Sequence, residues 1–320
     1  MLRFVVRRLA GMAIVLFAVS VLIFLIFNVV PNSNPAQQLA GKNARPFLVK
    51  NIEEEWGFDK SLPEQYVTMM KLVVNGELTS YEPRIPVNDR IKEGIPATIS
   101  LSVGAGIIWL FFGILLGYLS ALKPGGLLDR LLTAVAVAGI SIPVFLLAPV
   151  FIYVLAEQLE LFPNGGYVPI SEDPGEWFKH LILPWVTLAI LSIGFYSRVL
   201  RSNMLDVMNE DYVRTARAKG LSERKVMTRH VLRNSLIPII TLFGLDFGAT
   251  IAGTAIITET LYDINGVGSY AADAVTNFEL PPIMGVTLYG AFFVVFINAL
   301  VDITYAYLDP RVRLGEAAAE

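Results

Sequence analysis

The chain has 320 residues, of which 54% are hydrophobic and 17% are charged, whereas soluble domains average roughly 45–50% and about 25%. A soluble chain of this length must still cover its surface with polar side chains, so this composition argues against a soluble fold. The absence of cysteine excludes Cys-ligated zinc, iron–sulfur centres and thiol catalysis. The net charge of -3 is uninformative as a total. Composition therefore predicts an integral membrane protein.

Six apolar runs of about 20 residues are each long enough to cross ~30 Å of hydrocarbon. They cover residues 9–30, 97–122, 131–156, 181–202, 236–258 and 283–308. Pro143 lies near the middle of the third run and Pro149 follows it, which predicts a kink there. We therefore expect an all-α integral membrane protein with six transmembrane helices.

The positive charges in the connections alternate between the two sides of the membrane. Short connections on one side carry 16 Lys and Arg residues, and those on the other side carry one. The positive-inside rule then places both termini in the cytoplasm. The first run is about 22 residues long and no A-x-A site follows it, so we interpret it as an uncleaved anchor. The predicted organisation is a tip and first span (1–30), an extracytoplasmic loop or cap (31–96), a five-span core (97–308) and a cytoplasmic tail (309–320).

The cytoplasmic segment 203–235 has the capping pattern of a short helix beneath the membrane. Asn209 can cap a helix that opens with acids and closes with cations, and Gly220 stands where a left-handed residue would end it. Ser222 can cap a second helix that leads into the fifth span. Such a helix can insert into a groove on another protein. The alternative is a basic loop that only satisfies the topology and touches anionic lipid.

Asp246 is the one acid deep within an apolar run. Because an ionisable group there costs about 2.5–3.5 kcal/mol on insertion scales, it should face protein or water. It either lines a substrate pathway or makes a structural hydrogen bond to a neighbouring helix. Asn298, toward the cytoplasmic end of the last run, is structural by default and a second pathway candidate.

Small residues allow transmembrane helices to approach closely, either within the chain or at a subunit interface. The candidates for such packing are Gly113 and Gly117 in the second run, and Gly244, Gly248 and Gly253 in the fifth.

Several motifs resemble those of permease subunits of ABC importers. The stretch Asp211-Tyr212-Val213-Arg214-Thr215-Ala216-Arg217-Ala218-Lys219-Gly220-Leu221 looks like their EAA loop, in the version of the dipeptide/oligopeptide type. Arg7-Arg8-Leu9, Gly94-Ile95-Pro96-Ala97-Thr98, Glu259-Thr260-Leu261 and the motif at 305–313 resemble the B-type subunit. Departures lie on the outer side: Gly266-Val267-Gly268 lacks a preceding Trp-Pro pair, Met284 stands where Gln is common, and the loop 163–166 differs. They bear on the substrate and the binding protein.

The resemblance implies a type I (MetI-like) permease fold in a bacterial or archaeal plasma membrane. It also implies a second, C-type permease, two ATPase subunits (D and F type, or one dimeric ATPase) and an extracytoplasmic binding protein that delivers peptides. Nickel, glutathione or sugars are alternative substrates, and membrane lipid, not nucleic acid, surrounds the chain. The resemblance assigns ATPase coupling to Asp211, Tyr212, Arg214, Thr215, Ala216, Arg217, Ala218, Lys219, Gly220 and Leu221.

The sequence contains no G-x-x-x-x-G-K-[ST], so the chain has no Walker A loop to bind nucleotide phosphates. Energy from ATP must then come from partner subunits that bind ATP and Mg, and we expect a non-catalytic chain without a cofactor or metal of its own. An ion-gradient-driven secondary transporter is the main alternative, but such proteins usually show related halves and several buried charges. An intramembrane aspartyl protease would need its acid motifs in another order, and His180 and His230 lie on opposite predicted sides, which disfavours a zinc enzyme.

Overall fold

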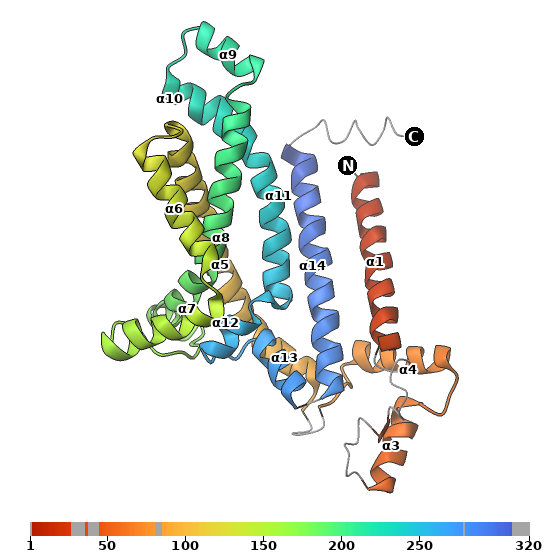
Figure 1. The fold of residues 1–320 in the computed structure, drawn as a ribbon. Coiled ribbons are helices and arrows are strands. Elements are labelled where there is room, and N and C mark those ends of the chain that lie inside the picture. Colours follow the sequence, from red (N-terminus) through yellow and green to blue (C-terminus); the bar gives the residue numbers. More distant parts are fainter. Residues whose placement is uncertain (1, 27–35, 38–44, 81–84, 278, 309–320) are drawn as a thin grey trace. The chain divides into compact units, whose positions relative to one another are not determined.

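The computed structural model describes residues 2–26, 36–37, 45–80, 85–277 and 279–308. Apart from an isolated bridge between Thr79 and Pro86, these residues form helices and their connections (Figure 1). The all-α prediction is therefore confirmed. The predicted tail 309–320 lies outside the described residues.

Most of the predicted spans appear as long apolar helices. Among the described residues, five helices are long and apolar enough to cross a membrane: Val6–Phe24, Val87–Leu122, Pro174–Val207, Glu223–Thr254 and Leu280–Val301. The helices Val87–Leu122 and Glu223–Thr254 begin 10 and 13 residues before the apolar runs that predicted them, since polar residues extend each helix beyond the hydrocarbon-length segment.

The third predicted span is not a single helix. It consists of α6 (Leu127–Ser141) and α7 (Val144–Phe151), which continues as η2 (Ile152–Gln158), and the two parts are bent by 97°. The chain is extended at Ile142 and Pro143, because the ring of a proline disfavours helical backbone at the residue before it. The disturbance predicted at Pro143 is confirmed and takes the form of a sharp break. If this bent pair is counted as one span, the described residues contain six candidate spans.

The chain divides into two compact units, and residues 1–98, 248–256 and 265–320 form unit 1. Its elements are α1 (Leu2–Phe24), α3 (Pro46–Trp56), α4 (Leu62–Asn75), the start of α5 (Val87–Leu122), η4 (Thr250–Thr254), α13 (Val267–Thr276) and α14 (Leu280–Leu308). Helix α1 packs along α14, which also contacts α13 and η4 (Figure 1). The cap helices share one core with the ends of α1 and α14, built from residues such as Phe24, Trp56, Met69, Leu78 and Met284.

Residues 99–247 and 257–264 form unit 2. It contains the remainder of α5, then α6, α7, η2, α8 (Pro174–Val207), α9 (Asp211–Ala218), α10 (Glu223–Lys225), η3 (Val226–Leu232), most of α11 (Arg233–Ala249) and most of α12 (Ile256–Leu261). Helix α8 is central, because α6 and α7 both pack against it. A Cβ atom at Gly117 of α5 would lie 2.7 Å from the Ser197 carbonyl oxygen, so α5 approaches the backbone of α8.

Helix α8 begins at a strong capping signal. The Asp173 carboxylate accepts hydrogen bonds from the backbone N–H groups of Gly175 (2.8 Å) and Glu176 (3.0 Å), and Pro174 occupies the first turn. Near this end of α8, the Gly166 N–H donates to the Tyr262 carbonyl oxygen at 2.8 Å. The other end of α8 leads into α9 (Figure 1).

Candidate functional site

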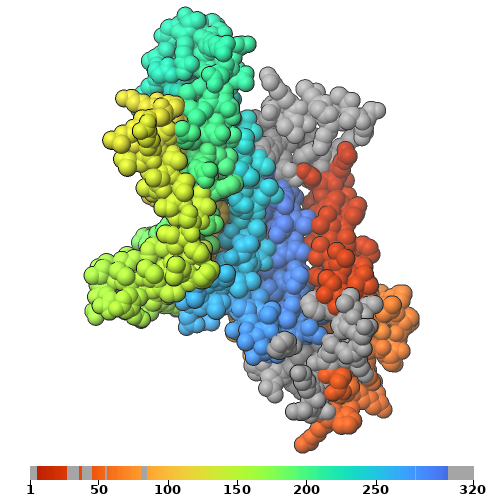
Figure 2. Space-filling model, in the orientation of Figure 1, coloured from red at the N-terminus to blue at the C-terminus, as the bar shows by residue number. Residues whose placement is uncertain are grey.

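A short helix stands at one end of unit 2, as the sequence predicted. Helix α9 covers Asp211–Ala218 and follows the end of α8 after three residues. Figure 2 shows α9 and α10 as the tip of unit 2, beyond α6 and α8. The prediction that Asn209 caps α9 was wrong. Glu210 occupies the capping position of α9, and the Asn209 Nδ2 atom donates to the Leu205 carbonyl oxygen at 3.0 Å. Asn209 therefore completes α8 instead of starting α9.

The predicted helix end at Gly220 is confirmed. Gly220 has a φ of 77°, in the left-handed region that glycine adopts without a Cβ clash. The N–H of Gly220 donates to the Arg217 carbonyl oxygen at 2.9 Å, and the N–H of Leu221 donates to the Ala216 carbonyl oxygen at 3.3 Å. These two bonds form a Schellman motif, which satisfies carbonyl groups that the helix end would otherwise leave unpaired.

One face of α9 is buried against the helical run that follows it. Val213 and Ala216 are buried on α9, and Val226, Met227 and Val231 are buried on η3, which α9 contacts. Because Ala216 points into this contact, its small side chain brings α9 close to η3 and is not presented to solvent. The burial of these apolar side chains fixes the angle at which α9 lies.

Two polar contacts brace α9 at its sides. The Arg217 guanidinium donates to both carboxylate oxygens of Glu223, at 2.8 and 3.2 Å, and this hydrogen bonding raises the pKa of Arg217. It also lies 3.5 Å from the Met208 carbonyl oxygen, which ties it to the end of α8. The Asn234 Nδ2 atom of α11 donates to the Tyr212 hydroxyl oxygen at 3.0 Å. Arg217 and Tyr212 thus hold α9 to its own chain.

The opposite face of α9 and the following turn are exposed. Some of the residues that the sequence assigned to coupling are exposed there and take no part in the two bracing contacts. They are Asp211, Arg214, Thr215, Ala218, Lys219, Gly220 and Leu221. This surface combines two cations, one acid and the apolar Leu221 side chain, which is 37% exposed. A partner with an apolar groove and an acidic rim would match it.

The two pathway candidates lie in different units. Asp246 is exposed on α11, and its carboxylate accepts a 2.7 Å hydrogen bond from the Tyr196 hydroxyl of α8. Tyr196 is itself 1% exposed. Asn298 is half-buried on α14 in unit 1. Both interpretations of Asp246 thus retain support, since it has a helix partner and an exposed side chain.

The glycines that the sequence marked as packing candidates have different roles in the structure. A Cβ atom at Gly113 would lie 2.7 Å from the Tyr196 Cβ atom, so Gly113, like Gly117, packs α5 against α8 within the chain. Gly248 lies against Ile297 of α14, at a Cβ distance of 3.2 Å. Gly244 is buried, and Gly253, which lies inside η4, has a φ of 139° that kinks the helical run at that point.

Sequence reasoning missed an ion pair that the fold buries. Asp129 of α6 and Arg201 of α8 were counted as charges of two solvated connections, yet the Arg201 guanidinium donates to both Asp129 carboxylate oxygens at 2.7 Å. An available signal was that Asp129 lies just before the run 131–156 and Arg201 is the next-to-last residue of the run 181–202, at ends that the charge distribution predicts to lie on the same side of the membrane. Elsewhere among the described residues, no three His, Cys, Asp or Glu side chains gather as a metal site would require.

Two family models match most of the sequence. Residues 113–314 match the family described as binding-protein-dependent transport system inner membrane component, and residues 1–102 match its N-terminal counterpart. The chain belongs to this family. The matched range includes α9, Asp246 and Asn298, and the chain is therefore a multi-pass permease subunit of a multi-component ABC transport system.

Relatives of the permease are similar over almost its whole length. A probable peptide ABC transporter permease protein of Sinorhizobium fredii is 38% identical over 311 residues, 97% of this chain and 99% of the relative. The dipeptide transport system permease protein DppB of Bacillus subtilis is 34% identical over 317 residues, covering 98% and 99%. The probable D,D-dipeptide transport system permease protein DdpB of Escherichia coli is 35% identical over 331 residues, covering 97% of each.

Proposed function

We propose that the chain forms part of the translocation pathway of an ATP-driven peptide importer, and that α9 is its coupling helix. The observation that carries the coupling proposal is the way in which α9 is held. This short helix is exposed on one face, packs against η3 on the other, and is braced by the Arg217–Glu223 and Tyr212–Asn234 contacts. The names of the relatives support peptides as the substrate class.

The coupling step follows from how α9 is connected. Helix α8 precedes α9 by three residues, and the helical run Glu223–Thr254 follows it shortly afterwards. A push on α9 therefore reaches two membrane helices at once. These helices carry Tyr196 and Asp246, whose hydrogen bond lies within the apolar segments. Closure of the ATPases would move both helices as a rigid-body switch between inward and outward access.

Other subunits supply the remaining parts of the proposed transporter. A second permease completes the pathway, two ATPase subunits bind ATP and Mg on the cytoplasmic side of α9, and an extracytoplasmic binding protein delivers the peptide. The charge distribution supports this orientation in the plasma membrane, with both termini inside. The chain itself performs no chemical step on its substrate, and Asp246 and Asn298 are its pathway candidates.

The test uses the complex that copurifies with the tagged chain in mild detergent, reconstituted into liposomes with a radiolabelled dipeptide. Gly220→Pro should abolish ATP-driven uptake, because proline fixes φ near -65° and removes the N–H that caps α9. Gly57→Pro is the matched control: Gly57 also ends a short helix with a left-handed φ of 66°, and its N–H also donates to that helix. The control should retain ATP-driven uptake.

Two results would contradict the proposal. Wild-type uptake that needs an ion gradient and no ATP would favour a secondary transporter. Normal uptake and normal ATPase association in Gly220→Pro would remove α9 from the coupling step.

A further inference from the structure

The carboxylate of Asp129 gathers donors from three helices and a turn. It accepts two hydrogen bonds from Arg201 of α8, one from the Ser120 hydroxyl of α5 and one, at 2.8 Å, from the N–H of Gly125. The Thr133 hydroxyl of α6 lies 3.4 Å away. Gly125 has a left-handed φ of 76°, which points its N–H at the carboxylate from the turn that joins α5 to α6. The Asp129 side chain is 5% exposed, and this buried carboxylate has a hydrogen-bond donor at each of its oxygens.

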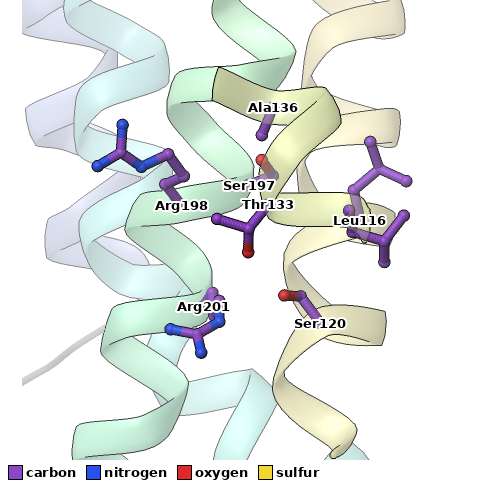
Figure 3. A pocket seen from close by; sticks show the side chains of 8 residues that line it. Leu116, Ser120, Thr133, Ala136, Ser197, Arg198 and Arg201 are labelled. Atoms are coloured by element: carbon purple, nitrogen blue, oxygen red, sulfur yellow. The ribbon is translucent and has the colours of Figure 1, made fainter. Parts of the chain in front are cut away.

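The pair is placed at the end of α8 that leads to α9. Arg201 lies six residues before the end of α8, and Met208, which follows that end, accepts the contact from Arg217 of α9. Two guanidinium groups thus connect these elements. That of Arg217 links α9 to the end of α8, and that of Arg201, through Asp129, links α8 to the α5–α6 turn. Figure 3 shows Arg201 of α8 and Ser120 of α5 facing each other across a small pocket, with Thr133 of α6 beside them.

Above the pair, the three helices touch by their backbones. Gly117 of α5 lies against the Ser197 carbonyl oxygen of α8, and Gly194 of α8 lies against the Ala136 carbonyl oxygen of α6. Glycine contacts bring the helix backbones close together but form no directional side-chain bond, so they do not by themselves fix the register between two helices. A bidentate guanidinium–carboxylate pair has a fixed planar geometry and specifies one register.

We infer that Asp129 and Arg201 are positioning residues of the coupling step: their pair fastens the end of α8 to the α5–α6 turn, so that displacement of α9 moves α5, α6 and α8 as one body. The inference rests on the proposed function of α9. Without the pair, motion of α9 would be absorbed by slippage of α8, and ATP would be hydrolysed with less transport.

The experiment measures radiolabelled dipeptide taken up per ATP hydrolysed by the purified complex in proteoliposomes. Arg201→Lys keeps the charge and loses the bidentate geometry, and Asp129→Asn keeps the shape and loses the charge. Each variant should assemble and hydrolyse ATP while its transport-to-hydrolysis ratio falls roughly fivefold, the low end for coupling between two sites. A variant that merely folds poorly would lower transport and hydrolysis together and leave the ratio unchanged.

A cross-link separates positioning from charge. Because the chain has no cysteine, Asp129→Cys with Arg201→Cys creates its one addressable pair. A short bifunctional thiol reagent with a cleavable disulfide should restore the ratio, and reduction should lower it again. Lys50→Cys with Glu54→Cys, at an exposed pair in the cap, is the matched control and should respond to neither step.

The outcomes distinguish this inference from the proposed function. If the wild type shows no ATP-driven uptake, the proposed function fails and the inference fails with it. If the wild type transports but Arg201→Lys and Asp129→Asn keep the wild-type ratio, or the cross-link restores nothing, the inference alone is overturned.

Discussion

Unit 2 contains two arginine–carboxylate pairs with the same two-pronged geometry and very different surroundings. In the Asp129–Arg201 pair the side chains are 5% and 29% exposed, whereas in the Glu223–Arg217 pair they are 61% and 38% exposed. The first joins residues 72 positions apart and the second joins residues six apart. The buried pair therefore fixes tertiary packing, and the exposed pair only braces a local turn.

The difference in burial also sets what each pair contributes to stability. A carboxylate removed from water depends on its partner, because loss of the partner leaves a desolvated charge. An exposed pair exchanges its contacts for hydration at little cost. Two pairs of an arginine and a carboxylate, at similar distances, are thus expected to have unequal effects on the free energy of unfolding.

The largest expected effect is that of Asp129→Ala. It removes the acceptor of Arg201, Ser120 and the Gly125 N–H, and we expect a destabilisation of about 3 kcal/mol, at the low end for a broken buried pair because Arg201 is partly exposed. Thermal unfolding of the purified complex in detergent measures this change. A shift as small as that of Glu223→Ala would show that burial does not distinguish the two pairs.

Replacing both members of the buried pair should be milder. Asp129→Leu with Arg201→Leu leaves no desolvated charge, so the loss should be about 1–2 kcal/mol, from the unsatisfied Gly125 N–H and Ser120 hydroxyl. The same unfolding assay tests it. A double variant less stable than Asp129→Ala would contradict this account of the pair. Stability restored without transport would sharpen the distinction between packing and positioning.

The exposed pair should respond weakly and in a salt-dependent way. Glu223→Ala should reduce stability by about 0.2–1 kcal/mol at low salt, because solvent already screens the two groups. The difference from the wild type should shrink in ~1 M NaCl, where the Debye length is about 3 Å. Unfolding midpoints at both salt concentrations provide the test, and a salt-independent loss would indicate that Glu223 has a packing role.

The smallest effect should come from a pair on a single helix. Glu54→Ala breaks the Lys50–Glu54 contact of 3.9 Å, whose side chains are 74% and 67% exposed. Such i,i+4 pairs contribute about 0.3–0.5 kcal/mol, so the unfolding midpoint should stay close to that of the wild type. A loss comparable to that of Asp129→Ala would mean that exposure does not govern the series.

Local features of this protein were readable from its sequence. Long apolar runs located five of the membrane helices, and Gly220 marked the end of α9. Hydrocarbon length and backbone conformation act within one segment, which is why neighbouring residues suffice to predict them. The cap of α9 was missed because Asn209 had a competing partner in the last turn of α8, at the Leu205 carbonyl oxygen.

What the tertiary structure alone decided are the relations between segments. Proline predicted a disturbance at Pro143, but the 97° bend depends on how α6 and α7 pack on α8. The Gly113/Gly117 motif fits a subunit interface and internal packing equally, until Tyr196 is found against it. Likewise, Asp129 and Arg201 are 72 residues apart, and their pairing depends on which helix faces meet. Sequence determined the membrane segments and α9; packing determined which side chains connect them.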